Sequence, residues 1–299
     1  MLSSALKAAI EMFIEQEKLP ASYAATAEQW FVPVMEEILH KTSTATETLV
    51  VGVSGCQGSG KSTLAGLLVI MLKESMGLNC INLSLDDFYL TLAERQKLST
   101  TVHPLLLTRG VPGTHDVELA INTIEALKQA GTVPVPRFDK SVDDRSPEEE
   151  WPHVQGPVDV IVLEGWCLSI GAEPEASLQE PTNELEAQED TEGVWRSYVN
   201  QIIKDKYQSL YEQIDFLIML KAPAFEKVFE WRQNQEDKLI EKLQKEGADT
   251  NSSKVMNKEQ LKRFIHHYER VTRHGLKTLP TKADVVFELT EEQGIASRL

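Results

Sequence analysis

The sequence has few of the features that a membrane protein, a disulfide framework or a nucleic-acid-binding surface requires. No run of about 18 apolar residues occurs, so we expect no membrane-spanning helix. Three cysteines are an odd number without metal-ligand spacing, which is typical of a reducing compartment. Basic residues number 30 against 46 acidic ones, and the formal charge is −16. This balance argues against binding to a phosphate backbone, which needs a basic stripe.

The first residues also lack the marks of a targeting peptide. Residues 1–15 have no basic leading region or small-residue cleavage site, and they carry glutamates that transit peptides avoid. We therefore expect a cytoplasmic protein. The chain has 299 residues, of which 41% are hydrophobic, and this is enough for a large α/β domain with a sizeable core.

Apolar runs alternate with amphipathic stretches along most of the chain. Runs such as Val158–Leu163 are typical of strands buried on both faces of a parallel sheet. We predict an α/β fold with a doubly wound, mainly parallel five-stranded sheet, helices on both faces, and a site at the carboxyl ends of the strands. The predicted strands are 48–54, 79–85, 158–163, 214–220 and 284–289, and the helices are 62–76, 116–130, 194–212, 223–246 and 257–274.

Two further amphipathic helices, 3–17 and 25–40, precede the first strand. The apolar stripe that begins at Trp30 would pack on the main domain, although a partner-binding face is an alternative interpretation. We therefore divide the chain into an N-terminal helical extension, residues 1–46, and a main domain, residues 47–299.

Two polar segments interrupt the pattern. Residues 171–193 are acidic and contain prolines, so we expect a solvated excursion between a strand and the helix that begins near Trp195. Residues 245–253 predict a break between the last two helices.

The first strand leads directly into a phosphate-binding loop. Gly55–Ser62 matches G-x-x-x-x-G-K-[ST], and an amphipathic helix follows. In this motif glycines let backbone N–H groups surround a polyphosphate, Lys61 reaches the β- and γ-phosphates, and the Ser62 hydroxyl ligates magnesium. A glycine-rich turn is the alternative, but the context favours ATP and Mg²⁺. The predicted nucleotide-binding residues are Gly55, Cys56, Gln57, Gly58, Ser59, Gly60, Lys61, Ser62 and Thr63.

Acidic residues stand at the ends of two other strands. Asp86 and Asp87 follow the second strand, where they could serve as base or metal ligand, or could simply cap the next helix. Because successive side chains in an extended chain point oppositely, only one of the two should face the γ-phosphate. Glu164 ends the third strand, and we expect it to hold magnesium together with Ser62.

Two loops, 109–116 and 135–141, concentrate basic and hydrogen-bonding groups. They suit a small, polyhydroxylated substrate with a carboxylate bound by an arginine, although a tight turn alone could explain Gly110–Thr114. His115 would orient the turn or the substrate. Arg232, on the helix after the fourth strand, is either a lid arginine over the phosphates or an ordinary surface charge. The predicted substrate residues are Asp87, Tyr89, Arg109, His115, Asp116, Arg137 and Lys140.

These motifs resemble the D-glycerate 3-kinase family, which belongs to a group of P-loop kinases with phosphoribulokinase, uridine kinase and pantothenate kinase. The resemblance implies that Asp86 is the general base, that Glu164 is the metal-linked acid, and that the lid lies near 229–233. It extends from about Leu49 to the C-terminus. The segments that carry it are the phosphate-binding loop, Leu83–Leu90, Arg109–Asp116, Val135–Ser141 and Leu163–Trp166.

We therefore predict an ATP-dependent kinase that phosphorylates a primary hydroxyl, and the resemblance points to D-glycerate and its 3-hydroxyl. Asp86, Lys61 and Arg232 are the predicted catalytic residues. One alternative is a kinase of the same group that acts on a nucleoside, a pantothenate-like compound or another hydroxylated metabolite. Another is a non-catalytic, ATP-binding regulatory protein that docks through the Trp30 face. We expect neither nucleic acid nor membrane as a partner, and the sequence leaves the oligomeric state open.

Overall fold

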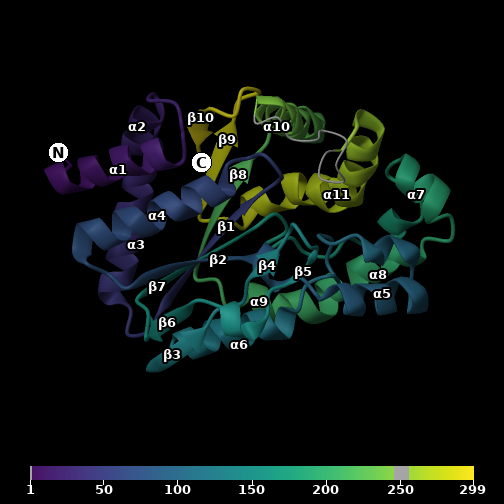
Figure 1. Cartoon of the computed structure of the whole chain (residues 1–299), viewed down its shortest axis with the longest axis horizontal. Coiled ribbons are helices and arrows are strands. Elements are labelled where there is room, and N and C mark those ends of the chain that lie inside the picture. The colour runs from purple at the N-terminus through teal and green to yellow at the C-terminus, as the bar shows by residue number, and fades with distance from the viewer. Residues whose placement is uncertain (1, 246–255) are drawn as a thin grey trace.

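The computed structural model describes residues 2–245 and 256–299 and contains a central six-stranded sheet (Figure 1). Five strands are parallel, so the predicted doubly wound, mainly parallel sheet is confirmed. A sixth, antiparallel strand at one edge was not predicted. In spatial order the strands are β10 (Ile295–Arg298), β9 (Val285–Leu289), β8 (Phe216–Lys221), β1 (Leu49–Gly55), β7 (Val160–Gly165) and β2 (Cys80–Ser84).

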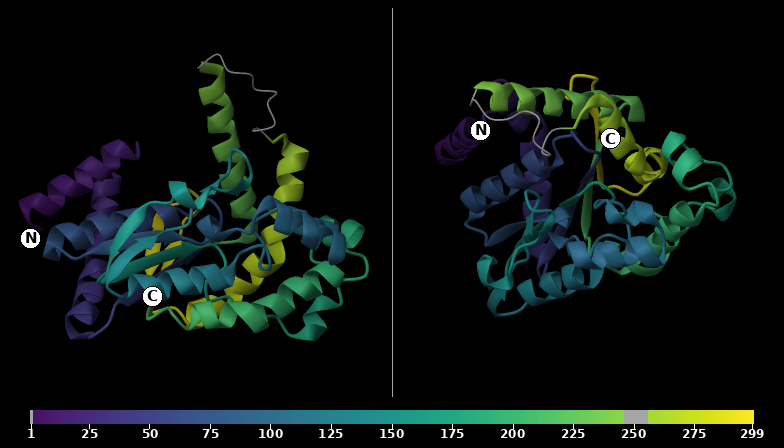
Figure 2. Two further views of the ribbon diagram at one scale, coloured as in Figure 1. Left: turned by 60° about the horizontal axis from the view of Figure 1, so that its bottom comes forward. Right: turned by 45° about the vertical axis from the view of Figure 1, so that its right-hand side comes forward.

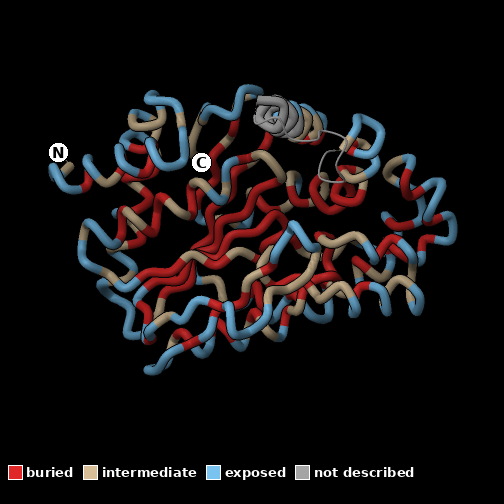
Figure 3. Tube along the Cα trace, viewed as in Figure 1, coloured by how far each residue is buried: buried red, intermediate tan, exposed pale blue. Residues whose placement is uncertain are grey.

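The strands are buried on both faces because helices cover the sheet on both sides. Every residue of β1 and β7 is buried, which explains their continuous apolar sequence (Figure 3). Val51 and Val53 of β1 face one core, whereas Val50 faces the other. The first core includes α4 (Lys61–Met76) and the N-terminal helices, and the second includes α6 (Val117–Leu127), α8 (Val194–Ile202) and α9 (Gln208–Tyr211).

The predicted helices of the main domain are all present. The predicted helix 194–212 comprises α8, a π-helical turn and α9, and the last two are α10 (Phe225–Lys245) and α11 (Lys258–Thr278). Figure 2 (left) shows α10 standing out from the sheet beside the first turns of α11. The predicted break at 245–253 lies outside the described residues except for Lys245. None of the helices in the described part of the chain has both the length and the apolar character that a membrane span requires.

Several short elements were missed because their sequences lack a clear apolar period. The polar helix α5 (Leu92–Thr101) buries only Arg95. Two small antiparallel pairs lie between α6 and β7, and the second of them shapes the loop that contains Lys140. Their bounds are β3 (Gly131–Pro134) with β6 (His153–Gly156), and β4 (Phe138–Asp139) with β5 (Asp144–Arg145).

The N-terminal helices lie against the sheet and α4. Trp30 and Phe31 meet the ring of Phe287 on β9 edge to face, with centroids 6.4 and 5.6 Å apart. The apolar stripe therefore packs on the rest of the protein. The domain boundary at residue 46 stays a prediction. The helices are α1 (Ser4–Gln16), α2 (Tyr23–Thr26) and α3 (Val32–Thr44), with a π-helical turn between the last two.

The acidic segment 171–193 is largely exposed, as predicted, but it is also folded and anchored to the rest of the protein. It contains a 3-10 turn (Glu175–Leu178) and α7 (Glu184–Glu189), and it buries the carboxylate of Glu186. Arg270 of α11 donates to both oxygens of this carboxylate, at 2.8 and 2.6 Å. The acidic composition did not reveal this buried anchor because the arginine partner lies far along the chain.

Removing the arginine of this buried pair should destabilise the fold. We expect Arg270→Ala to lower the free energy of unfolding by about 3–5 kcal/mol, because Glu186 would keep a buried charge without its partner. Arg263→Ala is a matched control on the same helix. It breaks an exposed pair with Glu189, which should cost at most about 1 kcal/mol. Urea denaturation measures both, and equal losses would contradict the stabilising role of Arg270.

Candidate active site

The loop between β1 and α4 forms an anion site at the carboxyl edge of the sheet. Gly58 and Gly60 have φ values of 80° and 88°, in the left-handed region that favours glycine. Lys61 begins α4, so the unpaired N–H groups and positive dipole end of a 16-residue helix lie at the loop. This arrangement suits phosphate groups. The other predicted nucleotide-binding residues lie in the loop or the adjoining ends of β1 and α4: Gly55, Cys56, Gln57, Ser59, Ser62 and Thr63.

A buried carboxylate lies beside this loop. The Ser62 hydroxyl donates to Oε1 of Glu164 at 2.9 Å, and the Ser84 hydroxyl donates to the same atom at 2.7 Å. Oε2 of Glu164 is buried and accepts no hydrogen bond among the described residues, and Lys61 Nζ lies 3.8 Å from it.

A carboxylate oxygen without a hydrogen bond, next to a serine hydroxyl, fits a hard cation such as Mg²⁺. The described residues hold no group of three or more His, Cys, Asp or Glu side chains that could bind a metal ion. Ser62 and Glu164 could therefore hold magnesium if phosphate oxygens and water supplied the other ligands, which is how Mg²⁺ is usually bound in nucleotide sites.

Asp86 lies in the 3-10 turn that follows β2 and faces the cleft. Its Oδ1 accepts a hydrogen bond from the Tyr89 hydroxyl, and its Oδ2 accepts one from Lys140 Nζ, both at 2.7 Å. Burial raises the pKa of Asp86, but the positive charges of Lys140 and Lys61 outweigh it and lower the pKa to about 2. The carboxylate is thus ionised at neutral pH.

Asp87 has different partners from Asp86. Its Oδ2 accepts from Arg137 at 3.0 Å, and its Oδ1 accepts from the backbone N–H of Phe138 at 3.2 Å. Burial raises the pKa of Asp87, although Arg137 opposes the rise. Asp87 and Arg137 therefore anchor the loop that carries Lys140, and neither is among the described residues that line the cleft.

The cleft has a volume of about 180 Å³ and lies between the phosphate-binding loop, Asp86 and α11. Among the described residues, four basic side chains and one carboxylate line it, so the cleft is locally positive in an acidic protein. Aromatic rings form much of its wall. The basic residues are Lys61, Arg109, Lys140 and Arg232, the acid is Asp86, and the aromatic residues are Tyr89, Trp166, Phe264 and Tyr268.

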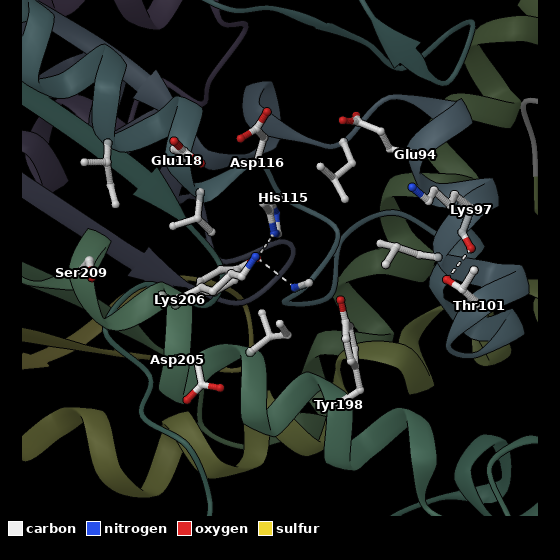
Figure 4. Close-up of a pocket in the computed structure, with 17 residues that line it drawn as sticks. Glu94, Lys97, Thr101, His115, Asp116, Glu118, Tyr198, Asp205, Lys206 and Ser209 are labelled. Carbon is white, nitrogen blue, oxygen red and sulfur yellow. Dashed lines mark hydrogen bonds between the residues drawn. The ribbon is translucent and has the colours of Figure 1, made fainter.

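His115 and Asp116 do not line this cleft, and their predicted role as substrate residues stays a prediction. They line a second cavity of about 560 Å³ (Figure 4), whereas Tyr89, which stacks on His115, lines the cleft. The His115 ring stacks on Tyr89 at 4.7 Å, and its Nδ1 lies 2.6 Å from the Tyr207 hydroxyl. Burial lowers the pKa of His115 to about 4, so the ring is neutral at pH 7. It packs against the ring of Tyr89 and helps to fix its position. Asp116 caps α6 by accepting from the N–H of Leu119 at 3.0 Å.

Several residues that hold the site together were missed in the sequence. Arg95 is 1% exposed and donates to the carbonyls of Leu90 and Leu107, at 3.2 and 2.8 Å, and to Asp143. Asp143 also pairs with Arg109, so a buried side chain of α5 joins three loops. The composition of α5 gave no signal for this role. Ser84 could have been found, because it is a polar residue in an apolar strand just before Asp86.

Comparison of the sequence with known proteins finds similarity to kinases, as a phosphate-binding loop beside a basic cleft suggests. Residues 50–169 match the model of the phosphoribulokinase/uridine kinase family. A Schizosaccharomyces pombe protein described as uncharacterized kinase mug58 is 33% identical over 231 residues, which is 73% of this chain and 78% of that protein. The chloroplastic D-glycerate 3-kinase of Arabidopsis thaliana is 34% identical over 195 residues, or 62% of this chain and 40% of that protein.

A solved structure supports the same relationship. D-glycerate 3-kinase from Cryptococcus neoformans var. grubii matches with a TM-score of 0.73 and 30% identity, over 89% of this chain and 97% of that one. Given these relatives and a phosphate-binding loop beside a basic cleft, the chain belongs to the phosphoribulokinase/uridine kinase family and is a P-loop small-molecule kinase.

Proposed function

We propose that this kinase transfers the γ-phosphate of Mg·ATP to the primary hydroxyl of a small hydroxy acid, with D-glycerate converted to 3-phosphoglycerate. The observation that carries the proposal is the position of Asp86, an ionised carboxylate that faces a small basic cleft beside the phosphate-binding loop. The names of the Arabidopsis and Cryptococcus relatives support D-glycerate as the acceptor.

The cleft provides the groups that phosphoryl transfer needs. The acceptor oxygen would attack the γ-phosphorus, the bond to the ADP oxygen would break, and the hydroxyl proton would pass to Asp86. Lys61 and the N–H groups of the loop would bind the β- and γ-phosphates, and Arg232 would add positive charge from α10. Held by Ser62 and Glu164, Mg²⁺ would neutralise charge on the phosphates when bound.

The size and charge of the cleft favour a short anionic acceptor. Arg109 and Lys140 line it and can attract a carboxylate. A volume of about 180 Å³ suits a three-carbon acid better than a nucleoside. A coupled assay of ADP release with D-glycerate, glycerol, uridine and pantothenate tests the proposal, and NMR of the product identifies the phosphorylated oxygen. ATP binding without D-glycerate turnover would refute it.

Replacing the carboxylate of Asp86 should impair catalysis more than nucleotide binding. In Asp86→Asn the amide cannot take the acceptor proton, so we expect kcat to fall by about 10²–10⁴. Calorimetry should give an unchanged affinity for Mg·ATP. Asp205→Asn is a suitable control, because Asp205 is exposed and lines the second cavity, not the cleft. A kcat for Asp86→Asn within a factor of about two of the wild type would remove Asp86 from the mechanism.

Replacing Glu164 should affect the metal dependence of the reaction. Glu164→Gln keeps the size of the side chain and removes the negative charge, so we expect the Mg²⁺ concentration for half-maximal rate to rise about 10–100-fold. Nucleotide titrations with and without EDTA provide a second measurement, in which Mg²⁺ should strengthen ATP binding less in the variant. An unchanged Mg²⁺ requirement would show that Glu164 acts only as a hydrogen-bond acceptor for Ser62 and Ser84.

A further inference from the structure

Both oxygens of Asp86 are engaged in the structure. Tyr89 donates to Oδ1 and Lys140 donates to Oδ2, each at 2.7 Å. Both residues line the cleft, and the Lys140 side chain is 59% exposed against 27% for Asp86, so the ammonium group is the more exposed member of the pair. An acceptor hydroxyl must hydrogen-bond to its base before it can give up a proton. Lys140 therefore occupies one of the two acceptor positions of Oδ2 and competes with a hydroxyl that approaches this oxygen from the cleft.

The hydrogen bond from Tyr89 is the harder one to release. Tyr89 is 4% exposed, its ring stacks on His115 at 4.7 Å, and Phe138 packs edge-on against it at 5.1 Å. The hydroxyl cannot leave Asp86 unless these rings move. Oδ1 thus stays bound, and Oδ2 is the oxygen that can become available.

Lys140 can leave without any change in the fold. It lies in the turn of residues 140–143 between β4 and β5, where Lys140 is exposed. Both ends of this turn are fixed. The N–H of Phe138 donates to Asp87 at 3.2 Å, and Arg95 donates to the carbonyl of Asp143 at 2.5 Å. Rotation of the flexible side chain of Lys140 can therefore move the ammonium group while the backbone stays in place.

We propose that Lys140 is a latch on Asp86 which the carboxylate of the acceptor opens, so that only acidic alcohols gain full access to the base. This inference rests on the proposed function. A hydroxy acid would take the ammonium group onto its own carboxylate, and its hydroxyl would then donate to the freed Oδ2. The hydroxyl proton goes to Oδ2 as the new oxygen–phosphorus bond forms and ADP leaves with the electrons of the broken bond.

Opening the latch would also make the base stronger. Lys140 is the first of the positive charges that lower the pKa of Asp86, ahead of Lys61. When the ammonium group moves to the substrate, Asp86 loses part of this stabilisation and accepts a proton more readily. A neutral alcohol has no carboxylate to attract Lys140, so the hydrogen bond between Lys140 and Asp86 stays in place when it binds. Lys140 would thus favour acidic substrates in two ways: it binds their carboxylate, and it leaves Asp86 a stronger base when it does so.

Steady-state kinetics with D-glycerate and glycerol can test the latch, because glycerol has a hydroxymethyl group where glycerate has its carboxylate. In Lys140→Met we expect kcat/KM for D-glycerate to fall at least about tenfold, because a charged hydrogen bond is lost. We expect kcat/KM for glycerol to rise at least about fivefold, because Oδ2 is open. Lys97→Met changes an exposed lysine of α5 outside the cleft and should alter neither value.

The response to glycerol separates the latch from a simpler role. If Lys140 only binds the carboxylate of the substrate, Lys140→Met weakens D-glycerate turnover and leaves glycerol unchanged, and this result would overturn the proposal. Lys140→Arg keeps the positive charge and should restore most of the discrimination between the two acceptors.

A measurement without turnover separates this inference from the proposed function. Carbon-13 NMR of the Asp86 carboxyl group, assigned with Asp86→Asn, should show the pKa of Asp86 rising in Lys140→Met. An unchanged pKa would overturn the latch even if D-glycerate proved to be the substrate. If the wild-type protein ignores D-glycerate while the pKa rises and glycerol turnover increases, the proposed acceptor fails and the pairing of Lys140 with the base stands.

Discussion

Three neighbouring parallel strands end at the same edge of the sheet, and the geometry of the site depends on their register. Glu164 of β7 lies beside Val53 of β1 on one side and Ser84 of β2 on the other. Because β1 continues into the phosphate-binding loop and β2 into Asp86, this pairing brings the anion site and both carboxylates together. A shift of one residue in β7 would turn Glu164 to the opposite face of the sheet.

Ion pairs within the protein hold in place three arginines from the loops that begin at Arg109 and Val135. Arg109 pairs with Asp143, Arg137 with Asp87, and Arg145 with Asp116. The acidic composition of the chain thus coexists with a cleft in which positive charge prevails. The carboxylates neutralise the arginines from outside the cleft, and the cations that line it remain close enough to attract an anion.

The sequence was informative where function depends on local segments and less so where it depends on distant contacts. The phosphate-binding loop and Asp86 follow buried strands and Glu164 lies near the end of one, so motif and burial pattern pointed to the same edge of the sheet. His115 was grouped with Arg109 because both belong to the loop 109–116, but the fold stacks His115 on Tyr89 and leaves it outside the cleft that Arg109 lines. Glu186 looked exposed because its partner is 84 residues away, a separation that composition does not reveal.

The hydrogen bonds of Arg95 have a consequence for the dynamics of the protein. One buried guanidinium group joins the segments at Leu90, Leu107 and Asp143, which flank the loops that carry Asp86, Arg109 and Lys140. Segments that share such a junction lose their order together, because opening any one of them leaves a buried charge without partners. We therefore expect the three loops to open as one cooperative unit, with a common opening free energy for their backbone amides in hydrogen exchange.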